Sequence, residues 1–183
     1  MRITGGQFRG RKLNTPQSNL IRPASDMVRQ AVFNMLLQYD LPDGATVLDG
    51  FSGTGSYGLE AISRGSLYCT FLEKNREALL LCKENCAILK VENETKIIRH
   101  DLQKPIQKPD NIAAANLIFL DPPYQQNLLT TAIKNIAKGG WASGNSIFVL
   151  EMSKKETPDF YELIIRGDKT YGQSRVVIAE YTG

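Results

Sequence analysis

The 183-residue sequence is poor in the residues on which metal sites and disulfide frameworks depend. It contains one histidine and three cysteines, and Cys69, Cys82 and Cys86 form no CxxC pair. An odd cysteine count without such a pair argues against a disulfide framework and for a reducing compartment. Because a structural zinc site usually needs four ligands, we expect no metal. The cysteines are expected to be small, buried, apolar side chains.

Long apolar segments are also missing. No stretch approaches the roughly 20 apolar residues that span a bilayer, and the first residues lack the apolar core of a secretory signal. We therefore expect a cytoplasmic protein that does not act with a membrane. The length predicts one domain over residues 1–183 with a substantial core, and we expect it to be monomeric.

The net charge of the chain is small, but the charges are unevenly distributed. The net charge is +3, yet residues 1–30 carry six basic residues and one acid, whereas the remainder carries 16 basic and 18 acidic residues. A basic segment on a near-neutral body is typical of a phosphate-binding surface, although a solvated tail is the alternative. Glycines at positions 5, 6 and 10 separate the charges, so a flexible basic arm suited to RNA is expected over residues 1–22. Its expected RNA-binding residues are Arg2, Phe8, Arg9, Arg11, Lys12 and Arg22.

Hydrophobic periodicity predicts alternating strands and helices. The expected strands are 46–48, 68–72, 96–99, 116–120, 146–150, about 160–166 and 175–181. The expected helices are one from the Ser25 cap to about Tyr39, and then 56–64, about 75–89 and 128–138. Asn75 is the expected cap of the third helix, and Gly65 is expected just past the end of the second. This alternation, followed by a hairpin, predicts an α/β fold with a doubly wound, mostly parallel Rossmann-like sheet of seven strands and an antiparallel C-terminal hairpin.

Asp121-Pro122-Pro123-Tyr124 directly follows the apolar strand at 116–120. The prolines fix their own φ and have no N–H, so a carboxylate and an aromatic ring are held by a rigid turn. Ligands of open α/β sheets bind at the carboxyl ends of the strands. The turn therefore predicts chemistry on a planar group with an exocyclic amine, although it also serves to end a strand.

The first expected strand leads into a glycine-rich loop, Asp49 to Gly55. Gly53 and Gly55 permit positive φ and close approach of a ligand to the backbone. A dinucleotide site would instead place GxGxxG at the strand end, and an acid at Asp49 would repel a pyrophosphate. S-adenosylmethionine (SAM) carries an ammonium and a sulfonium, so Asp49 favours SAM.

Acids follow the next strands as well. Glu73 ends the second strand, where a carboxylate commonly accepts both ribose hydroxyls. Asp101 follows the third strand and is expected to accept a hydrogen bond from the adenine amine, with Leu102 against the ring. The expected cofactor-binding residues are Asp49, Phe51, Gly53, Gly55, Glu73, Asp101 and Leu102.

Over nearly its whole length the sequence resembles the bacterial 16S rRNA guanine-N2 methyltransferase family of Class I SAM-dependent enzymes. The sequence departs from the usual pattern at five positions: Gly50 stands where a larger apolar residue is usual, and the others, around the first helix, are Ile21, Ala24, Met27 and Gln30. The stretches that carry the resemblance are Arg2-Ile3, Gly5 to Leu13, Arg22-Pro23, Ser25-Asp26, Val28-Arg29, Ala31 to Asn34, Val47 to Ala61, Ser63 to Gly65, Ile118 to Tyr124 and Lys169 to Gly172.

The resemblance implies a mechanism in which Asp121 and the Pro122 carbonyl accept the N–H groups of a guanine N2 amine. The amine lone pair would then point at the methyl group, and Tyr124 would stack on an unpaired or flipped base. The implied partner is ribosomal RNA or an assembling small subunit. Three alternatives remain open: an enzyme for adenine or cytosine amines in RNA or DNA, a Rossmann oxidoreductase, and a non-catalytic RNA-binding protein.

Overall fold

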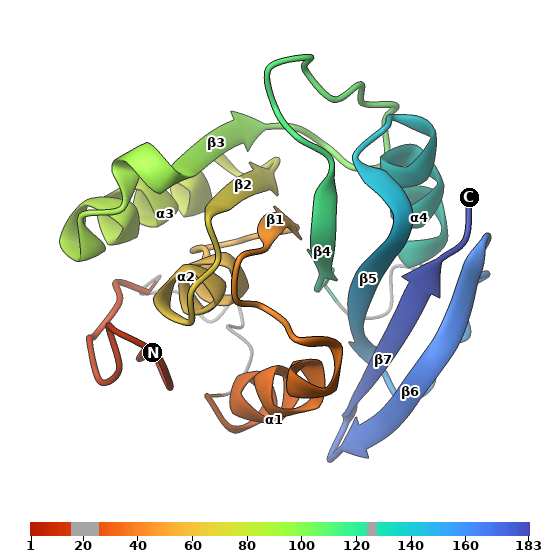
Figure 1. The fold of residues 1–183 in the computed structure, drawn as a ribbon, viewed down its shortest axis with the longest axis horizontal. Coiled ribbons are helices and arrows are strands. Elements are labelled where there is room, and N and C mark those ends of the chain that lie inside the picture. Colours follow the sequence, from red (N-terminus) through yellow and green to blue (C-terminus); the bar gives the residue numbers. More distant parts are fainter. Residues whose placement is uncertain (16–25, 124–127) are drawn as a thin grey trace.

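The computed structural model describes residues 1–15, 26–123 and 128–183, and its centre is one seven-stranded sheet. The strands lie in the order β3-β2-β1-β4-β5-β7-β6 (Figure 1). Strands β1 to β5 are parallel, whereas β7 pairs antiparallel with both β5 and β6. The bounds are β1 Thr46–Gly50, β2 Tyr68–Glu73, β3 Thr95–Arg99, β4 Ala115–Leu120, β5 Ala142–Ser153, β6 Leu163–Tyr171 and β7 Ser174–Tyr181. The predicted mostly parallel sheet with an antiparallel hairpin is confirmed.

Four α-helices cover the two faces of this sheet (Figure 1). Helices α1, α2 and α3 bury their apolar sides in one core cluster, and α4 buries its side in the other. Such burial on both faces is what makes the parallel strands near-continuous apolar runs. The bounds are α1 Asp26–Leu36, α2 Ser56–Ser63, α3 Arg76–Leu89 and α4 Leu129–Lys138, with short 3₁₀ turns at Leu37–Tyr39 and Glu92–Glu94.

The predicted caps of the second and third helices are confirmed, whereas the first helix ends at Leu36 and is followed by a 3₁₀ turn to Tyr39. The Asn75 side chain accepts the Ala78 N–H at 3.1 Å and so satisfies one of the free donors of α3. Past the end of α2, Gly65 adopts φ +105°, a conformation that glycine favours. Its N–H donates to the Ile62 carbonyl at 3.1 Å, which satisfies a carbonyl of the last turn. The expected cap at Ser25 lies outside the described residues.

The last three strands differ from their predicted bounds. β5 is 12 residues long, and β6 runs from Leu163 to Tyr171 rather than over about 160–166. β6 is an edge strand with mostly exposed side chains, so alternation of apolar residues does not mark it. The turn that joins β6 to β7 consists of Gly172 and Gln173, with positive φ at Gly172 as tight hairpins require.

Two further expectations concern burial. Cys69, Cys82 and Cys86 are free thiols, each at most 1% exposed, which confirms that they are small buried side chains. Within the described ranges, no helix combines the length and apolar character needed to cross a membrane.

Candidate functional site

The strand order reverses between β1 and β4, which lie side by side at the centre of the sheet. From β1 the chain proceeds outward to β2 and β3, and from β4 it proceeds in the other direction to β5. The loops that leave the carboxyl ends of β1 and β4 therefore diverge, and α/β proteins bind ligands in the crevice that this divergence is expected to leave. The glycine-rich loop and the Asp-Pro-Pro turn are these two loops, so the fold brings together the two segments that the sequence singles out.

The glycine-rich loop turns sharply between β1 and α2. Gly53 and Gly55 have φ values of +53° and +84°, and Phe51, half-buried beside them, has φ +59°. A side chain at Gly55 would place its Cβ 2.8 Å from the Cys82 sulfur, so the loop packs closely against α3. The two glycines therefore have the positive φ that the sequence predicts.

Asp49 is 2% exposed and lies at the carboxyl end of β1. Its Oδ2 accepts the Gly58 N–H of α2 at 2.8 Å. Burial raises the pKa of Asp49 from 3.8 to about 7, an effect to which the nearby charge of Glu73 adds and which the Gly58 hydrogen bond opposes. A buried carboxylate with a raised pKa favours a cation brought close to it. The arrangement thus suits the predicted positive ligand.

Glu73 closes the other side of the loop. Its Oε2 accepts the Gly53 N–H at 3.1 Å, and its Oε1 accepts the Asn75 N–H at 2.8 Å. The carboxylate is half-exposed and touches both the loop after β1 and the start of α3. Each oxygen has a second lone pair, so the carboxylate still has acceptors for a ribose.

Asp101 and Leu102 follow β3. The half-exposed Asp101 accepts the Gln103 N–H at 3.1 Å, whereas Leu102 is 2% exposed and belongs to the core beneath the loop. A Cβ at Gly50 would lie 2.6 Å from Leu120 and 2.9 Å from Leu102. Those two leucines fill the space that a larger residue at position 50 would need, which explains the glycine there.

The Asp-Pro-Pro turn begins directly after β4. Asp121 is half-buried, Pro122 is buried and Pro123 is exposed. The negative charge of Asp121 reaches the hydroxyl of Tyr57 on α2. Asp121 and Pro122 thus follow the strand next to β1, on the side of the sheet edge that carries the glycine-rich loop, whereas Tyr124 lies outside the described residues.

Two further residues at this edge were not anticipated from the sequence. Glu151, 4% exposed on β5, accepts the hydroxyl of Tyr57 at 2.7 Å. The Tyr57 ring stacks on Phe119 of β4, with ring centroids 4.9 Å apart and planes inclined by 17°. In the sequence Glu151 directly follows the strand expected at 146–150, as Asp121 follows the one expected at 116–120, and this shared pattern is the signal that could have identified it. Tyr57 carried no comparable signal.

The chain's own residues fit SAM at this crevice. Acids at the ends of β1 and β2 supply the negative charge that a sulfonium and an ammonium require. Within the described part of the chain, the buried Ser52 hydroxyl of the loop has no hydrogen-bond partner. A buried polar group without a partner is uncommon in folded proteins and marks a place where a ligand can supply one.

The N-terminal arm is not the flexible strand that its composition predicts. Over residues 1–15 it forms a closed loop with an antiparallel bridge between Arg2 and Lys12, and it buries Ile3 and Leu13 in the core. The arm is therefore part of the folded body, because two apolar residues between the charges anchor it.

A buried carboxylate on α2 organises this arm. Glu60 is fully buried and accepts the Thr4 and Gly5 N–H groups, each at 2.8 Å. It also accepts the Thr4 hydroxyl at 2.8 Å, Arg29 Nε at 3.3 Å and Arg64 Nε at 2.8 Å. A buried charge is tolerated when it is fully paired and hydrogen-bonded. The network therefore fixes the arm to α2, the helix that follows the glycine-rich loop.

A second contact fixes the middle of the arm. The Ser63 carbonyl accepts the Gln7 N–H at 2.7 Å, and the Ser63 hydroxyl accepts the Phe8 N–H at 3.0 Å. Gly6 has φ +75°, and a Cβ there would lie 1.7 Å from the Ser63 carbonyl oxygen. Phe8 is half-buried against the core, so it is less free to stack on a base than the sequence suggests.

The end of the arm is joined to the glycine-rich loop. Asn85 of α3 is fully buried, and its Oδ1 accepts the Asn14 N–H at 2.7 Å. Its Nδ2 donates to the carbonyls of Asn14 and Thr54, each at 3.1 Å. One side chain therefore joins the arm to the glycine-rich loop.

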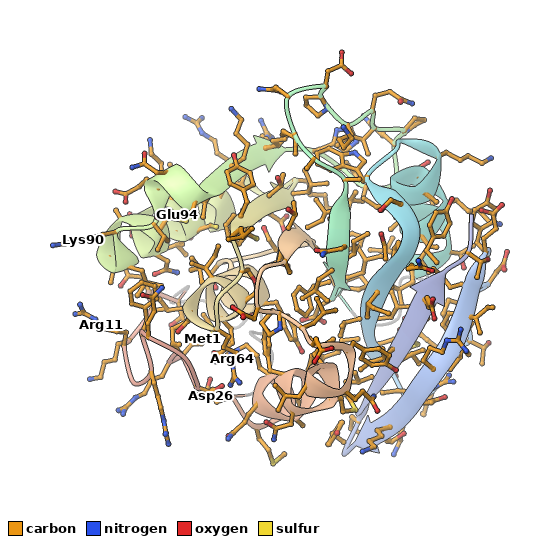
Figure 2. The ribbon with its side chains drawn as sticks, in the orientation of Figure 1. Met1, Arg11, Asp26, Arg64, Lys90 and Glu94 are labelled. Carbon is orange, nitrogen blue, oxygen red and sulfur yellow. The ribbon has the colours of Figure 1, made fainter. Side chains whose placement is uncertain are left out.

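Most of the predicted RNA-binding cations face solvent. Arg2, Arg9, Arg11 and Lys12 are exposed, and Figure 2 shows Arg11 on the outside of the arm. None of the four forms an ion pair with any other described residue. Arg22 lies outside the described residues. Arg29, counted in the basic segment, is instead fully buried and paired with Asp26 and Glu60, so it adds nothing to the basic surface.

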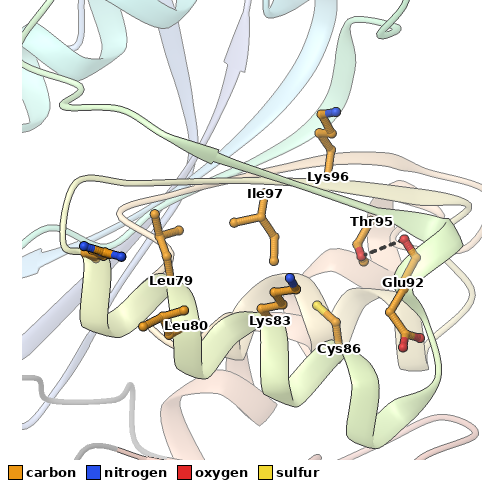
Figure 3. A pocket seen from close by; sticks show the side chains of 9 residues that line it. Leu79, Leu80, Lys83, Cys86, Glu92, Thr95, Lys96 and Ile97 are labelled. Atoms are coloured by element: carbon orange, nitrogen blue, oxygen red, sulfur yellow. Dashed lines mark hydrogen bonds between the residues drawn. The ribbon is translucent and has the colours of Figure 1, made fainter.

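A separate hollow of about 400 Å³ lies between α3 and β3 (Figure 3). Its apolar walls include Leu79, Leu80 and Ile97, with Lys83 and Lys96 at the rim. None of the acids at the strand ends lines it. The hollow is therefore distinct from the crevice between β1 and β4.

Comparisons with known proteins agree with this geometry. A family described as "Conserved hypothetical protein 95" matches residues 1–180. "Ribosomal RNA small subunit methyltransferase D" of Haemophilus influenzae is 34% identical over 176 residues, which cover 94% of this chain and 89% of that protein. "Putative rRNA methyltransferase YlbH" of Bacillus subtilis is 30% identical over 191 residues and covers all of both chains. The solved "Putative methyltransferase yhhF" of Escherichia coli superposes with a TM-score of 0.84 at 28% identity, covering 100% of this chain and 98% of that one.

Proposed function

Since this chain belongs to the "Conserved hypothetical protein 95" family of Class I SAM-dependent methyltransferases, we propose that it methylates the exocyclic N2 amine of a guanine in small-subunit ribosomal RNA. Relatives that carry the name of small-subunit rRNA methyltransferase D support the RNA substrate. The choice of guanine N2 follows the resemblance of the Asp-Pro-Pro-Tyr turn to that family. Membership removes the oxidoreductase alternative.

The observation that carries the proposal is the position of Asp121 and Pro122. Their turn leaves β4 at the point where the strand order reverses, and β4 lies directly beside the strand that carries the glycine-rich loop. A methyl donor held by that loop and an amine held by the turn would therefore meet in one crevice. Reactants held in this way react far faster than when free, because their orientation is fixed in advance.

The donor would be held by residues of three strand ends. Asp49 supplies negative charge, Glu73 supplies acceptors for a ribose, and Gly53 and Gly55 let the backbone approach. Asp101 and Phe51 are proposed to line the adenine. SAM supplies a methyl group on positively charged sulfur. Leu102 supports this wall from within the core rather than by open contact.

Asp121 and the Pro122 carbonyl are proposed to accept the two N–H groups of the target amine. These hydrogen bonds favour a pyramidal nitrogen whose lone pair points at the methyl group. The negative charge of Asp121 also opposes the positive charge that develops on nitrogen, which lowers the barrier. Tyr124 is proposed to stack on the base, an interaction worth about 1–3 kcal/mol.

Recognition of RNA is assigned to the arm. Its exposed cations Arg2, Arg9, Arg11 and Lys12 form a fixed set, because Glu60 and Ser63 hold the backbone that carries them. A preformed basic surface binds phosphates without the loss of entropy that ordering a flexible tail would require. Arg22 and Phe8 are proposed to extend this surface.

The test is a transfer assay with SAM labelled in the methyl group. Naked rRNA and small subunits, both from a strain that lacks the modification, are incubated with the protein, digested and separated into nucleosides. We expect the label in N2-methylguanosine. Label in N6-methyladenosine or in a methylated cytosine would show that the enzyme methylates the amine of another base and not that of guanine. SAM binding without transfer to either substrate would favour a non-catalytic RNA-binding protein.

A further inference from the structure

A second carboxylate stands beside Asp121 in the sheet. Strands β4 and β5 pair in parallel with Leu120 opposite Leu150, so Asp121 and Glu151 are the next residues of neighbouring strands. Side chains alternate between the faces of a sheet. Phe119 and Val149, two residues earlier, both belong to the core cluster under α1 and α2, and this alternation directs both acids to that same face.

Tyr57 joins this second carboxylate to α2, the helix that follows the glycine-rich loop. It is the second residue of α2 and 3% exposed, and its hydroxyl donates to Glu151 Oε2 at 2.7 Å. Burial and the charges of Glu151 and Asp121 hold the pKa of Tyr57 well above its ordinary value. The hydroxyl therefore stays protonated and remains a donor, and the fields of both carboxylates meet at it.

We propose that Glu151, held by Tyr57, is a positioning residue that raises the affinity of Asp121 for the proton released by the methylated amine. This rests on the proposed amine methylation. Transfer breaks the S–CH₃ bond, whose electron pair stays on sulfur, and forms the N–CH₃ bond from the amine lone pair. One amine proton then passes to the Asp121 carboxylate and on to water. A like charge close to a carboxylate makes it hold a proton more strongly.

Among the described residues, charged groups of α1 and β1 also lie near this part of the sheet. From α1 the buried Arg29 reaches Tyr57 with an opposing charge, but its Nε is bound to Glu60 and its Nη2 to Asp26. On β1, the Asp49 carboxylate accepts the Gly58 N–H. Glu151 is therefore the carboxylate that the strand register places next to Asp121.

The experiment compares pH–rate profiles of methyl transfer in the wild type, Glu151→Gln and Tyr57→Phe. Glutamine keeps the size of Glu151 and an oxygen for the Tyr57 hydroxyl, while phenylalanine keeps the ring stacked on Phe119. We expect the acid limb of the profile to move to lower pH by about one unit in Glu151→Gln and in the same direction in Tyr57→Phe. Glu180→Gln, which removes a carboxylate paired with Arg166 on the outer hairpin, is the control and should leave the limb unmoved.

A direct titration separates this inference from the identity of the substrate. Aspartates labelled with ¹³C in the carboxyl group are followed by NMR, and the Asp121 resonance is identified by its absence in Asp121→Asn. The pH at the midpoint of the Asp121 titration should be lower in Glu151→Gln than in the wild type, and it should be unchanged in Glu180→Gln. An unchanged midpoint in Glu151→Gln would overturn the role of Glu151. Label in a base other than guanine would overturn only the substrate.

Discussion

The carboxylates at this crevice differ in their burial and in their hydrogen-bond partners, and these differences determine how readily each carries a charge. Glu73 is half-exposed and bonds two backbone N–H groups, whereas Asp49 is buried and bonds one. Burial disfavours the charged form of a carboxyl group. That is why the pKa of Asp49 rises to about 7. Asp49 thus holds a charge that is unfavourable for the fold alone and useful for a cationic ligand.

Asp49→Asn is expected to stabilise the protein without ligand. The folded-state pKa of about 7 lies above the unfolded value of 3.8, so the folded state binds more protons and loses stability as pH rises between them. Asparagine keeps an acceptor for Gly58 and removes the charge. The free energy of unfolding should rise by about 1–4 kcal/mol at pH 8, since one pKa unit corresponds to about 1.4 kcal/mol.

The gain should vanish near pH 4, where Asp49 is already protonated. Urea unfolding at the two pH values measures it, and isothermal calorimetry should show weaker SAM binding by the variant. A stability gain over the wild type that is no larger at pH 8 than at pH 4 would contradict the assigned burial cost.

The sequence predicts such residues when they follow a strand. Asp49, Glu73, Asp101 and Asp121 were all predicted because acids stand at the ends of four successive expected strands. Glu151 directly follows the strand expected at 146–150 and was nevertheless missed; in the structure it lies within β5, which continues to Ser153. Tyr57 could not be found, because an aromatic residue near a helix start gives no sign that its hydroxyl meets a strand 94 residues away.

At the scale of elements, the arm shows where composition misleads. Its glycines and cations are typical of a flexible tail, yet its structure depends on Glu60, 55 residues from Gly5. A contact across that separation leaves no local pattern in the sequence. Helices α2 and α3 were predicted more closely, because their caps at Gly65 and Asn75 are local.

Gly6→Ala is expected to detach the arm. The new Cβ would meet the Ser63 carbonyl oxygen at 1.7 Å, and φ +75° is unfavourable for alanine. The matched control is Gly10→Ala, which has φ +85° but no atom within 4 Å of its Cβ. We expect unfolding free energy to fall by about 1 kcal/mol in the control and by about 3 kcal/mol in Gly6→Ala. Equal losses would contradict the docking of the arm on α2.

Neutralising Arg9, Arg11 and Lys12 to glutamine should weaken RNA binding and flatten its dependence on salt. Each lost phosphate contact lowers the slope of log affinity against log salt by about 0.7–0.9. Fluorescence anisotropy at several salt concentrations measures this slope. Lys138 on α4, which packs on the other face of the sheet from the arm, serves as the control (Figure 1). An unchanged slope in the arm variant would show that these residues do not contact RNA phosphates and are only solvated.

At the scale of the whole molecule, the class of sheet was predictable and its strand order was not. Alternating strands and helices require parallel strands with right-handed connections, but several orders satisfy that rule. The observed order places β1 beside β4, and this single adjacency joins the two loops of the site. Function in this protein therefore depends on a pairing between segments about 70 residues apart, which only tertiary structure specifies.

The central claim is that the Asp121-Pro122 turn holds the amine that receives the methyl group. Its most direct test is single-turnover transfer by Asp121→Ala with SAM affinity measured on the same preparation. We expect the rate to fall by at least about 100-fold, while the SAM dissociation constant changes by less than about threefold. Transfer at a near-normal rate by Asp121→Ala would contradict the account.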